Sequence, residues 1–347
     1  MTRTVLYGLL SLGPLVILLD LVGVGAIGLF VLSAAALIPL AWLIGEATEQ
    51  AAHHTGPGIG GFLNATFGNA PELIIALFAV SAGLTEVVRG SLTGSIVGNL
   101  LLVLGFSLLF GGTGTLDPQS TYVSIGLVLL AVVLFLVPAV PGWEGDPERH
   151  QLDLLSLPVS VVLLVVYVAV TWAALRRHRQ LHASGEPAPE QPEAWSLRVA
   201  LGVLAAATLV TAFVAEILVH SLETFAEKAH LSDFFVAAVI VAIVGNAAEH
   251  GGAVVVAARG KITLAAEIAL ASSAQVAVFL IPAVALLAWL IDPLALSFRP
   301  VELGVLGAAS VVTALLLFPG RSSRLRGALL VGAYAAAATA FFLAGER

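Results

Sequence analysis

The sequence predicts an all-α polytopic membrane protein with about eleven transmembrane helices. Two observations support this fold class. Of the 347 residues, 59% are hydrophobic and only 11% are charged, whereas roughly 25% of the residues of an ordinary soluble protein are charged. Apolar segments of roughly 18 residues or more follow one another along nearly the whole chain, and each is long enough to cross a bilayer as a helix.

Polar turns divide the apolar sequence into eleven predicted spans. Their expected ranges are 4–20, 24–52, 58–83, 86–111, 120–138, 152–175, 197–226, 232–258, 261–291, 300–318 and 325–343. The first is expected to stay in the protein, because no small-residue cleavage site follows it. The turn after the second span is expected to hold His53 and His54, and Glu86 and Arg89 are expected to pair at the start of the fourth.

The spans are expected to form two halves on either side of a polar linker. We predict an N-terminal transmembrane helix over 1–22, a first five-helix repeat over 23–175, a cytoplasmic linker over 176–196 and a second five-helix repeat over 197–347. The linker opens with a basic run and continues in a stretch rich in Pro, Glu and Ala. An odd number of spans in each half reverses the second half, so the predicted repeat is inverted.

The basic residues predict the orientation. In the eleven-span layout, the N-terminus, the linker with the adjacent Arg198, and the turns at 259–261 and 321–326 share one side of the membrane, with ten of the fifteen Lys and Arg residues. Positively charged loops stay in the cytoplasm. The N-terminus is therefore expected inside and the C-terminus outside, in a prokaryotic inner (plasma) membrane.

A repeated pentapeptide lies inside two of the apolar segments. Gly68-Asn69-Ala70-Pro71-Glu72 returns 177 positions later as Gly245-Asn246-Ala247-Ala248-Glu249. A carboxylate in the middle of a membrane helix costs about 2.5–3.5 kcal/mol on insertion scales, so it is rare without a partner or a function. Duplicated halves with polar, Gly- and Pro-interrupted helices at corresponding positions are typical of secondary transporters.

Each pentapeptide places an amide and a carboxylate three residues apart, on one face of a helix. The pairs are Asn69 with Glu72 and Asn246 with Glu249. Their oxygen atoms suit calcium or a similar hard cation, and backbone carbonyls freed near Pro71 could join them. The same carboxylates can carry protons, because burial and a nearby carboxylate favour the neutral form. The alternative is that these groups only hydrogen-bond helices together.

Acidic residues on the preceding predicted helices could line a path for cations. Glu46 corresponds to Glu223 at the same offset of 177, and Glu49 lies three residues after Glu46. One helical face of the second half carries Glu216, His220, Glu223 and Glu227. Solvation of a helix end is the alternative interpretation for Glu49 and Glu227.

Small and polar residues after the pentapeptides form a third group. They are Ser95 and Asn99 in the first half and Ser272 and Gln275 in the second, and Asn99 corresponds to Gln275 within one residue. Their oxygen atoms can complete an oxygen shell, while close helix packing is the alternative, above all for the serines. His250 follows Glu249 directly and could support that carboxylate or relay protons, with packing as the alternative.

These motifs resemble those of the calcium/proton exchangers of the CAX family. In the first half, the resemblance rests on the runs 45–49, 63–73 and 91–105. In the second half, it rests on Glu216 and on the runs 221–223, 244–250 and 272–275. The resemblance covers spans two to four and seven to nine.

The resemblance implies eleven spans, an inverted five-plus-five repeat and a calcium site at the centre. Glu72 and Glu249 would be the central carboxylates and the metal ligands. The surrounding amides would be Asn69, Asn246, Asn99 and Gln275, and the access path would be lined by Glu46, Glu216 and Glu223.

Three positions depart from the family pattern. Pro71 stands where Val is more usual, Glu267 where Gly is usual and Gly98 where Ser is common. The Gly-Thr-Ser-x-Pro-Glu run and the second-repeat Asp of the sodium/calcium exchanger branch are absent from the sequence. Their absence favours protons as the counter-ion.

The expected function is secondary active antiport, in which cytoplasmic Ca²⁺ is exchanged for external H⁺ by alternating access at the central Glu pair. An exchanger for Mn²⁺ or Na⁺ and a passive cation channel are the alternatives. No cofactor is expected, and Ca²⁺ is the transported ion. The expected partners are Ca²⁺, H⁺ and the lipid bilayer, without nucleic acid and with self-association left open. An enzyme is not expected, because an intramembrane metalloenzyme would need a paired histidine spacing and a nucleophile.

Overall fold

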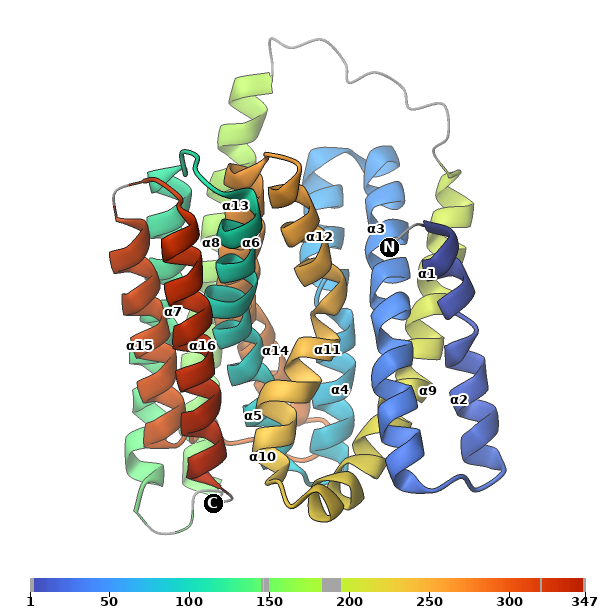
Figure 1. Ribbon diagram of the computed structural model, residues 1–347. Helices are drawn as coiled ribbons and strands as arrows, with labels where there is room; N and C mark the ends of the chain where they lie inside the picture. Colours follow the sequence, from blue (N-terminus) through green and yellow to red (C-terminus); the bar gives the residue numbers. More distant parts are fainter. Residues whose placement is uncertain (1–2, 145, 147–149, 183–194, 319, 346–347) are drawn as a thin grey trace.

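The computed structural model describes residues 3–144, 146, 150–182, 195–318 and 320–345, and within these it leaves out the side chains of 3–4, 56–62, 64–65, 174–175, 177–182 and 248–250. The described chain is a bundle of upright helices (Figure 1). It contains no β-strand, only one isolated β-bridge between Thr115 and Arg321. The predicted all-α class is confirmed.

The helices follow one another in the order below, and Figure 1 labels the α-helices among them. The first half contains α1 (Arg3–Leu9), α2 (Leu12–Leu21), α3 (Ala26–Phe67), α4 (Ala70–Ser81), α5 (Thr85–Val97), the π-helical η1 (Gly98–Val103), α6 (Leu104–Gly111), α7 (Pro118–Gly142) and α8 (His150–His182). The second half contains α9 (Leu197–Ala229), α10 (Asp233–Phe235), the π-helical η2 (Val236–Val241), α11 (Ala242–Gly245), α12 (Ala247–Ala258), α13 (Ile262–Gln275), the π-helical η3 (Val276–Leu280), α14 (Ile281–Ala288), α15 (Pro300–Leu317) and α16 (Arg324–Ala344).

Local sequence explains where the long helices begin. Asp117 caps α7 by accepting the backbone N–H groups of Gln119 and Ser120 at 3.3 and 3.0 Å. Pro118 occupies the first turn, where its missing N–H leaves no helical hydrogen bond unmade. Ser196 caps α9 in the same way as Asp117 caps α7. Such caps satisfy donors that a helix start otherwise leaves without partners.

The central helices repeat at the offset of the pentapeptide. α4 and α12 have 12 residues each and begin at 70 and 247, α5 and α13 begin at 85 and 262, and α6 and α14 have 8 residues each and begin at 104 and 281. Gly83 and Gly260, which follow α4 and α12, have φ of 73° and 82°. Glycine adopts this left-handed conformation without strain. Corresponding helices therefore end in corresponding turns.

The contacts between helices also come in matching pairs, one from each half. α4 packs on α9 and α12 packs on α3; α6 packs on α12 and α14 packs on α4; η1 packs against α16 and η3 packs against α8. When each helix is replaced by its counterpart in the other half, each of these contacts becomes the contact it is paired with. The main buried hydrophobic cluster runs through both halves, so the middle of the bundle is built by them jointly.

Three helix boundaries differ from the prediction. The span predicted over 4–20 is divided between α1 and α2. α3 remains helical from Ala26 to Phe67, so His53 and His54 lie in a helix and not in a loop. Gly and Pro are weak predictors of a break where neighbours support a helix, and α3 packs along α9 and against α12. α8 continues to His182, beyond the predicted linker start at 176, because Arg, Gln and Leu are good helix formers.

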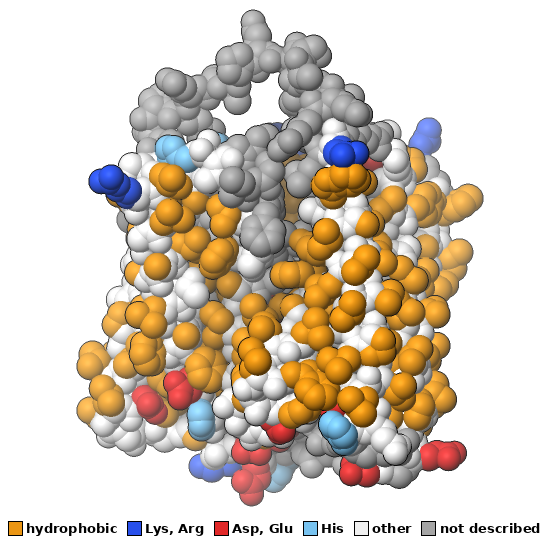
Figure 2. Space-filling view, turned by 180° about the vertical axis from the view of Figure 1, so that it is seen from behind, with side chains coloured by type: hydrophobic (Ala, Val, Ile, Leu, Met, Phe, Trp, Pro, Cys, Tyr) orange, Lys and Arg blue, Asp and Glu red, His pale blue; other side chains and the backbone are white. Residues whose placement is uncertain are grey.

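The described helices have the composition and surface of a membrane protein. Eight of them are long and apolar enough to cross a bilayer, and three shorter apolar helices accompany them. Figure 2 shows apolar side chains across the middle of one face, with Lys and Arg mainly at its upper edge and Asp and Glu mainly toward its lower edge. The protein is therefore an integral membrane protein.

Candidate functional site

Both pentapeptides interrupt helices at their asparagine. α3 and α4 are separated at Gly68 and Asn69, and α11 and α12 are separated at Asn246. Asn69 has φ and ψ of −101° and 17°, and Asn246 has −91° and 2°. Helix ends carry backbone N–H and C=O groups without helical partners. At membrane depth, such irregular backbone is tolerated where it is buried in protein or lines a cavity.

The carboxylate of Glu72 reaches from the first half to the second. The Glu72 side chain is buried, with 8% of the residue exposed. Its Oε1 atom lies 3.5 Å from the position that a Cβ atom would take at Gly245. The glutamate of the first pentapeptide therefore lies beside Gly245 of the second pentapeptide.

Three side-chain hydrogen bonds join the two halves in this region. They run from Nδ2 of Asn246 to Oγ of Ser95 (2.8 Å), from Nδ2 of Asn99 to Oγ of Ser272 (3.0 Å) and from Nδ2 of Asn69 to Oε1 of Gln275 (3.4 Å). Each bond pairs an amide of one half with a residue of the other. The structure thus pairs six of the predicted site residues across the halves.

The asparagine amides donate through nitrogen, which leaves their oxygen atoms as acceptors. Oδ1 of Asn246 is buried and accepts no hydrogen bond from the described residues. A buried acceptor costs about 1–3 kcal/mol when nothing satisfies it, so a ligand or water that meets it stabilises the protein. Carboxylate and amide oxygens are the ligands that calcium prefers. The arrangement can therefore coordinate a hard cation.

The second predicted carboxylate lies outside the described side chains. The backbone of Glu249 and His250 belongs to α12, but their side chains are not described. Among the described residues, no three histidine or acidic side chains converge to hold a metal ion. The described part of the predicted site therefore consists of Glu72, the amides and the serines.

The predicted access-path residue of the first half lies beside α4. Glu46, on α3, accepts a hydrogen bond from Nε2 of Gln50 at 3.2 Å. Ile44 and Ala47, on the same stretch of helix, pack in one buried cluster with Ala70 of the first pentapeptide. Glu46 thus lies on the part of α3 that packs near the helix break, while Glu49 is exposed.

The acidic residues of α9 do not lie beside Glu46 in the described contacts. Glu216 lines a cavity of about 600 Å³ between α2, the start of α3 and α9, together with Asp20 and His220. Glu223 and Glu227, further along α9, are exposed. The described contacts therefore connect Glu46 to the region of α4, and they place Glu216 beside α2.

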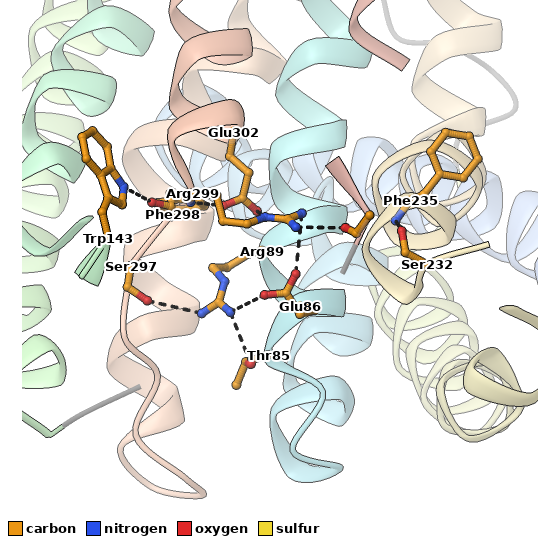
Figure 3. A network of polar contacts seen from close by, with 11 residues as sticks. Thr85, Glu86, Arg89, Trp143, Ser232, Phe235, Ser297, Phe298, Arg299 and Glu302 are labelled. Atoms are coloured by element: carbon orange, nitrogen blue, oxygen red, sulfur yellow. Dashed lines mark hydrogen bonds and ion pairs between the residues drawn. The ribbon is translucent and has the colours of Figure 1, made fainter. Parts of the chain in front are cut away.

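A buried ion network joins the starts of α5 and α15 (Figure 3). Nη2 of Arg89, a residue that is 2% exposed, donates to Oε1 of Glu86 at 2.8 Å. Oε2 of Glu86 lies 3.6 Å from Nη2 of Arg299. The carboxylate of Glu302 accepts the backbone N–H of Arg299. In this network two carboxylates face two guanidinium groups.

The sequence predicts the pair of Glu86 and Arg89 but not its partners in this network. The predicted helix-end pair is confirmed, with Arg89 buried and Glu86 partly exposed. One available signal was the capping box formed by Arg299 and Glu302, in which a glutamate three residues into the helix accepts the N–H of the cap. The capping box predicts where α15 begins, but it does not predict that this helix start packs against α5.

The sequence matches the family described as sodium/calcium exchanger protein over residues 25–176 and 199–343. A Ca²⁺/H⁺ antiporter of Aphanothece halophytica is 35% identical over 360 aligned residues, which cover 98% of this chain and 96% of the relative. The Ca²⁺/H⁺ antiporter ChaA of Bacillus subtilis (strain 168) is 39% identical over 325 residues, which cover 91% and 92%.

Two solved structures resemble the whole bundle. Native YfkE has a TM-score of 0.83 at 35% identity, and the alignment covers 97% of this chain and 99% of YfkE. The crystal structure of the H⁺/Ca²⁺ exchanger CAX has a TM-score of 0.75 at 15% identity, with 99% and 92% covered. The second likeness shows the fold alone.

Proposed function

We propose, from the premise that this chain belongs to the sodium/calcium exchanger family, that the protein is a secondary antiporter that exchanges Ca²⁺ for H⁺. Membership follows from the family match in both halves and from relatives that are 35% and 39% identical over nearly the full length. These relatives are named Ca²⁺/H⁺ antiporters. The family consists of transporters and not of enzymes.

The observation that carries the proposal for the site is that the polar groups of the two halves meet in one region. Glu72 lies beside Gly245, and amides of each half pair with residues of the other. Glu72 and Glu249 are the proposed central carboxylates and metal ligands. The proposed remaining shell consists of Asn69, Asn246, Asn99 and Gln275, with Ser95 and Ser272 holding the amides.

Proton coupling follows if the two glutamates serve both ions. Ca²⁺ needs the carboxylates ionised, whereas protons neutralise them, so one site holds either the cation or protons. Each ion then weakens the binding of the other by the same coupling free energy. Two interacting carboxylates titrate as a pair. His250, directly after Glu249, is the proposed support of the second carboxylate.

The proposed layout has eleven crossings and an inverted repeat. The eight long apolar helices and the three shorter ones supply the crossings. α1 begins in the upper half of Figure 1 and α16 ends at its lower edge. The basic upper edge in Figure 2 favours that edge as the cytoplasmic side, with the N-terminus inside and the C-terminus outside. The bacterial relatives favour a plasma membrane.

Alternating access is the proposed mechanism, because a repeat with its site at the interface of the halves can expose that site to one side at a time. Glu46, Glu216 and Glu223 are the proposed wall of the access path. The proposed role of Glu49 and Glu227 is to concentrate cations near it, because acidic clefts raise the local cation concentration.

Transport in sealed proteoliposomes tests the function. Ca²⁺ uptake should require an imposed proton gradient and should stop when a protonophore removes it. A passive channel would admit Ca²⁺ at the same rate without the gradient. Competition by Mn²⁺ and by Na⁺ tests the alternative exchangers. Glu144→Gln, at an exposed position, is the matched control for the glutamate variants.

Calorimetry in detergent tests the coupling separately. Ca²⁺ binding should weaken as the pH falls and should release protons, which are counted by titration in buffers of different ionisation enthalpy. Release of no protons across the pH range of transport would contradict the antiport mechanism.

A further inference from the structure

Gln50 joins a proposed access-path residue to the segment that leads into the second half. Its Nε2 atom donates to Oε1 of Glu46 at 3.2 Å, and its Oε1 atom accepts the backbone N–H of Trp195 at 3.1 Å. Glu46 and Gln50 are one turn apart on α3, whereas Trp195 lies just before α9. One side-chain amide therefore bridges two segments that are far apart in the sequence.

The peptide group of Trp195 fixes which way the Gln50 amide faces. A backbone N–H can only donate, so the Gln50 atom beside it must be the carbonyl oxygen. The amide nitrogen of Gln50 then faces Glu46, whose carboxylate accepts. If the amide turned over, it would place N–H groups against the N–H of Trp195 and an oxygen against the carboxylate. Only one of the two orientations satisfies both neighbours.

Trp195 is itself held against α3. Nε2 of His54 lies 2.6 Å from the carbonyl oxygen of Trp195, where a ring N–H donates. His54 is one turn after Gln50, so one face of α3 holds both the N–H and the C=O of Trp195. Trp195 also packs against the cluster of buried residues that includes Ile44 and Ala70. The donor that orients Gln50 is therefore fixed in position.

We propose that Gln50 is a positioning residue for Glu46 and that the peptide group of Trp195 orients Gln50. The inference rests on the proposed role of Glu46 in the cation path. A glutamate side chain without a fixed partner samples several rotamers. A carboxylate held by Gln50 keeps one direction, so it presents its charge to an approaching cation without reorganising. Gln50 acts on Ca²⁺ affinity without touching the ion.

A double-mutant cycle in proteoliposomes tests this proposal. Gln50→Leu keeps the approximate size of the side chain but can neither donate nor accept. It should raise the apparent KM for Ca²⁺ by about threefold to tenfold, as expected for the loss of one hydrogen bond, and should leave the maximal rate nearly unchanged. In a Glu46→Ala background, Gln50→Leu should cause no further rise. Gln119→Leu, at the exposed start of α7, is the matched control.

The outcomes separate this inference from the proposed function. An equal rise in KM in both backgrounds would mean that Gln50 does not act through Glu46, and it would overturn the inference. So would an unchanged KM in Gln50→Leu when Glu46→Ala alone raises it. If Glu46→Ala itself has no effect, the path assigned to Glu46 is wrong and the positioning role falls with it, while proton-driven uptake by the parent protein still supports the exchanger.

A second pair of variants tests the part of the peptide group. Trp195→Phe and Trp195→Pro both remove the indole, but only Pro removes the backbone N–H. The apparent KM for Ca²⁺ should be higher for Trp195→Pro than for Trp195→Phe by about the factor seen in Gln50→Leu. Equal KM values in the two variants would contradict the orienting role of the Trp195 peptide.

Discussion

The two halves carry matching polar groups at the centre, but their corresponding helices pack differently. α5 and α13 begin at matched positions, 85 and 262. On α5, Gly90 and Gly94 face α10 and η2 so closely that a Cβ atom at Gly90 would lie 2.8 Å from the carbonyl oxygen of Phe234. The matched positions on α13 are Glu267 and Ala271, and Ala271 is exposed.

The same contrast holds at the start of these helices. α5 carries Glu86 and Arg89 of the buried ion network, where α13 carries Thr263 and Ala266. Thr263 donates one hydrogen bond to the carbonyl oxygen of Thr115 at 2.7 Å. One helix is fixed by close backbone packing and by ion pairs, and the matching face of the other is more open. A transporter that opens its site to one side of the membrane at a time must pack its two repeats differently in each conformation, and the contrast between α5 and α13 is such a difference.

Replacement of the central glutamates should have the largest effect. Glu72→Gln and Glu249→Gln should each abolish proton-driven Ca²⁺ uptake in proteoliposomes, because the amide keeps the size but loses the charge and the proton exchange. Glu144→Gln should keep normal uptake. Near-normal uptake by only one of the two central variants would show that the halves are unequal at the centre as well.

Breaking the ion network should come next. Arg89→Met should destabilise the folded protein by about 3–5 kcal/mol, because it removes one of the two guanidinium groups that face the carboxylates of Glu86 and Glu302 and leaves one negative charge without compensation. Thr263→Val, at the corresponding end of α13, removes one hydrogen bond and should cost about 1 kcal/mol. Thermal unfolding in detergent, followed by tryptophan fluorescence, measures the difference. Equal losses would contradict the contrast between the two helix ends.

Adding a larger side chain at the matched positions of α5 and α13 should give a smaller difference in stability than breaking the ion network. Gly94→Val should cost at least about 1–3 kcal/mol, because the new side chain meets the backbone of η2. Ala271→Val, at an exposed position, should change stability by no more than about 0.5 kcal/mol. The same unfolding assay applies. If Ala271→Val is as damaging as Gly94→Val, the face of α13 is closed in the resting protein.

The acidic residues of α9 should give the smallest effects. Glu216→Gln and Glu223→Gln should raise the apparent KM for Ca²⁺ by no more than about fivefold, as expected for the loss of one partly exposed charge. The rise should shrink at high ionic strength, because salt screens exposed charges. Initial rates at two salt concentrations measure this. Complete loss of uptake would place these carboxylates at the centre and not on a path.

The helix breaks could be predicted from the sequence, whereas the pairing across the halves could not. Gly68 and Pro71 weaken a helix locally, and the structure interrupts the chain at Gly68 and Asn69. The bond between Asn246 and Ser95 depends on how two helices of different halves dock. Periodicity and propensity describe one helix at a time, so they predict which residues are polar but not which residues meet.

Arg299 illustrates a second limit of the sequence. It lies in the segment between α14 and α15, where a charged residue is expected to be solvated. In the structure it is 7% exposed, because the Glu86 carboxylate is near it and its guanidinium lies 3.9 Å from the centre of the Phe234 ring. These partners come from α5 and α10, so only the folded chain shows that this arginine is buried.

Two of the π-helical segments, η1 and η3, give two of the site amides a freedom of their own. η1 contains Asn99, and η3 starts directly after Gln275. α5 and η1 have 13 and 6 residues and α13 and η3 have 14 and 5, so the one-residue slip between the amides is absorbed before α6 and α14 begin. A π turn holds one extra residue, and when it shifts along a helix by one position it rotates the side chains it passes by about 100°. We therefore expect torsion within a helix, and not only tilting of whole helices, to swing the amide oxygens toward or away from a bound ion.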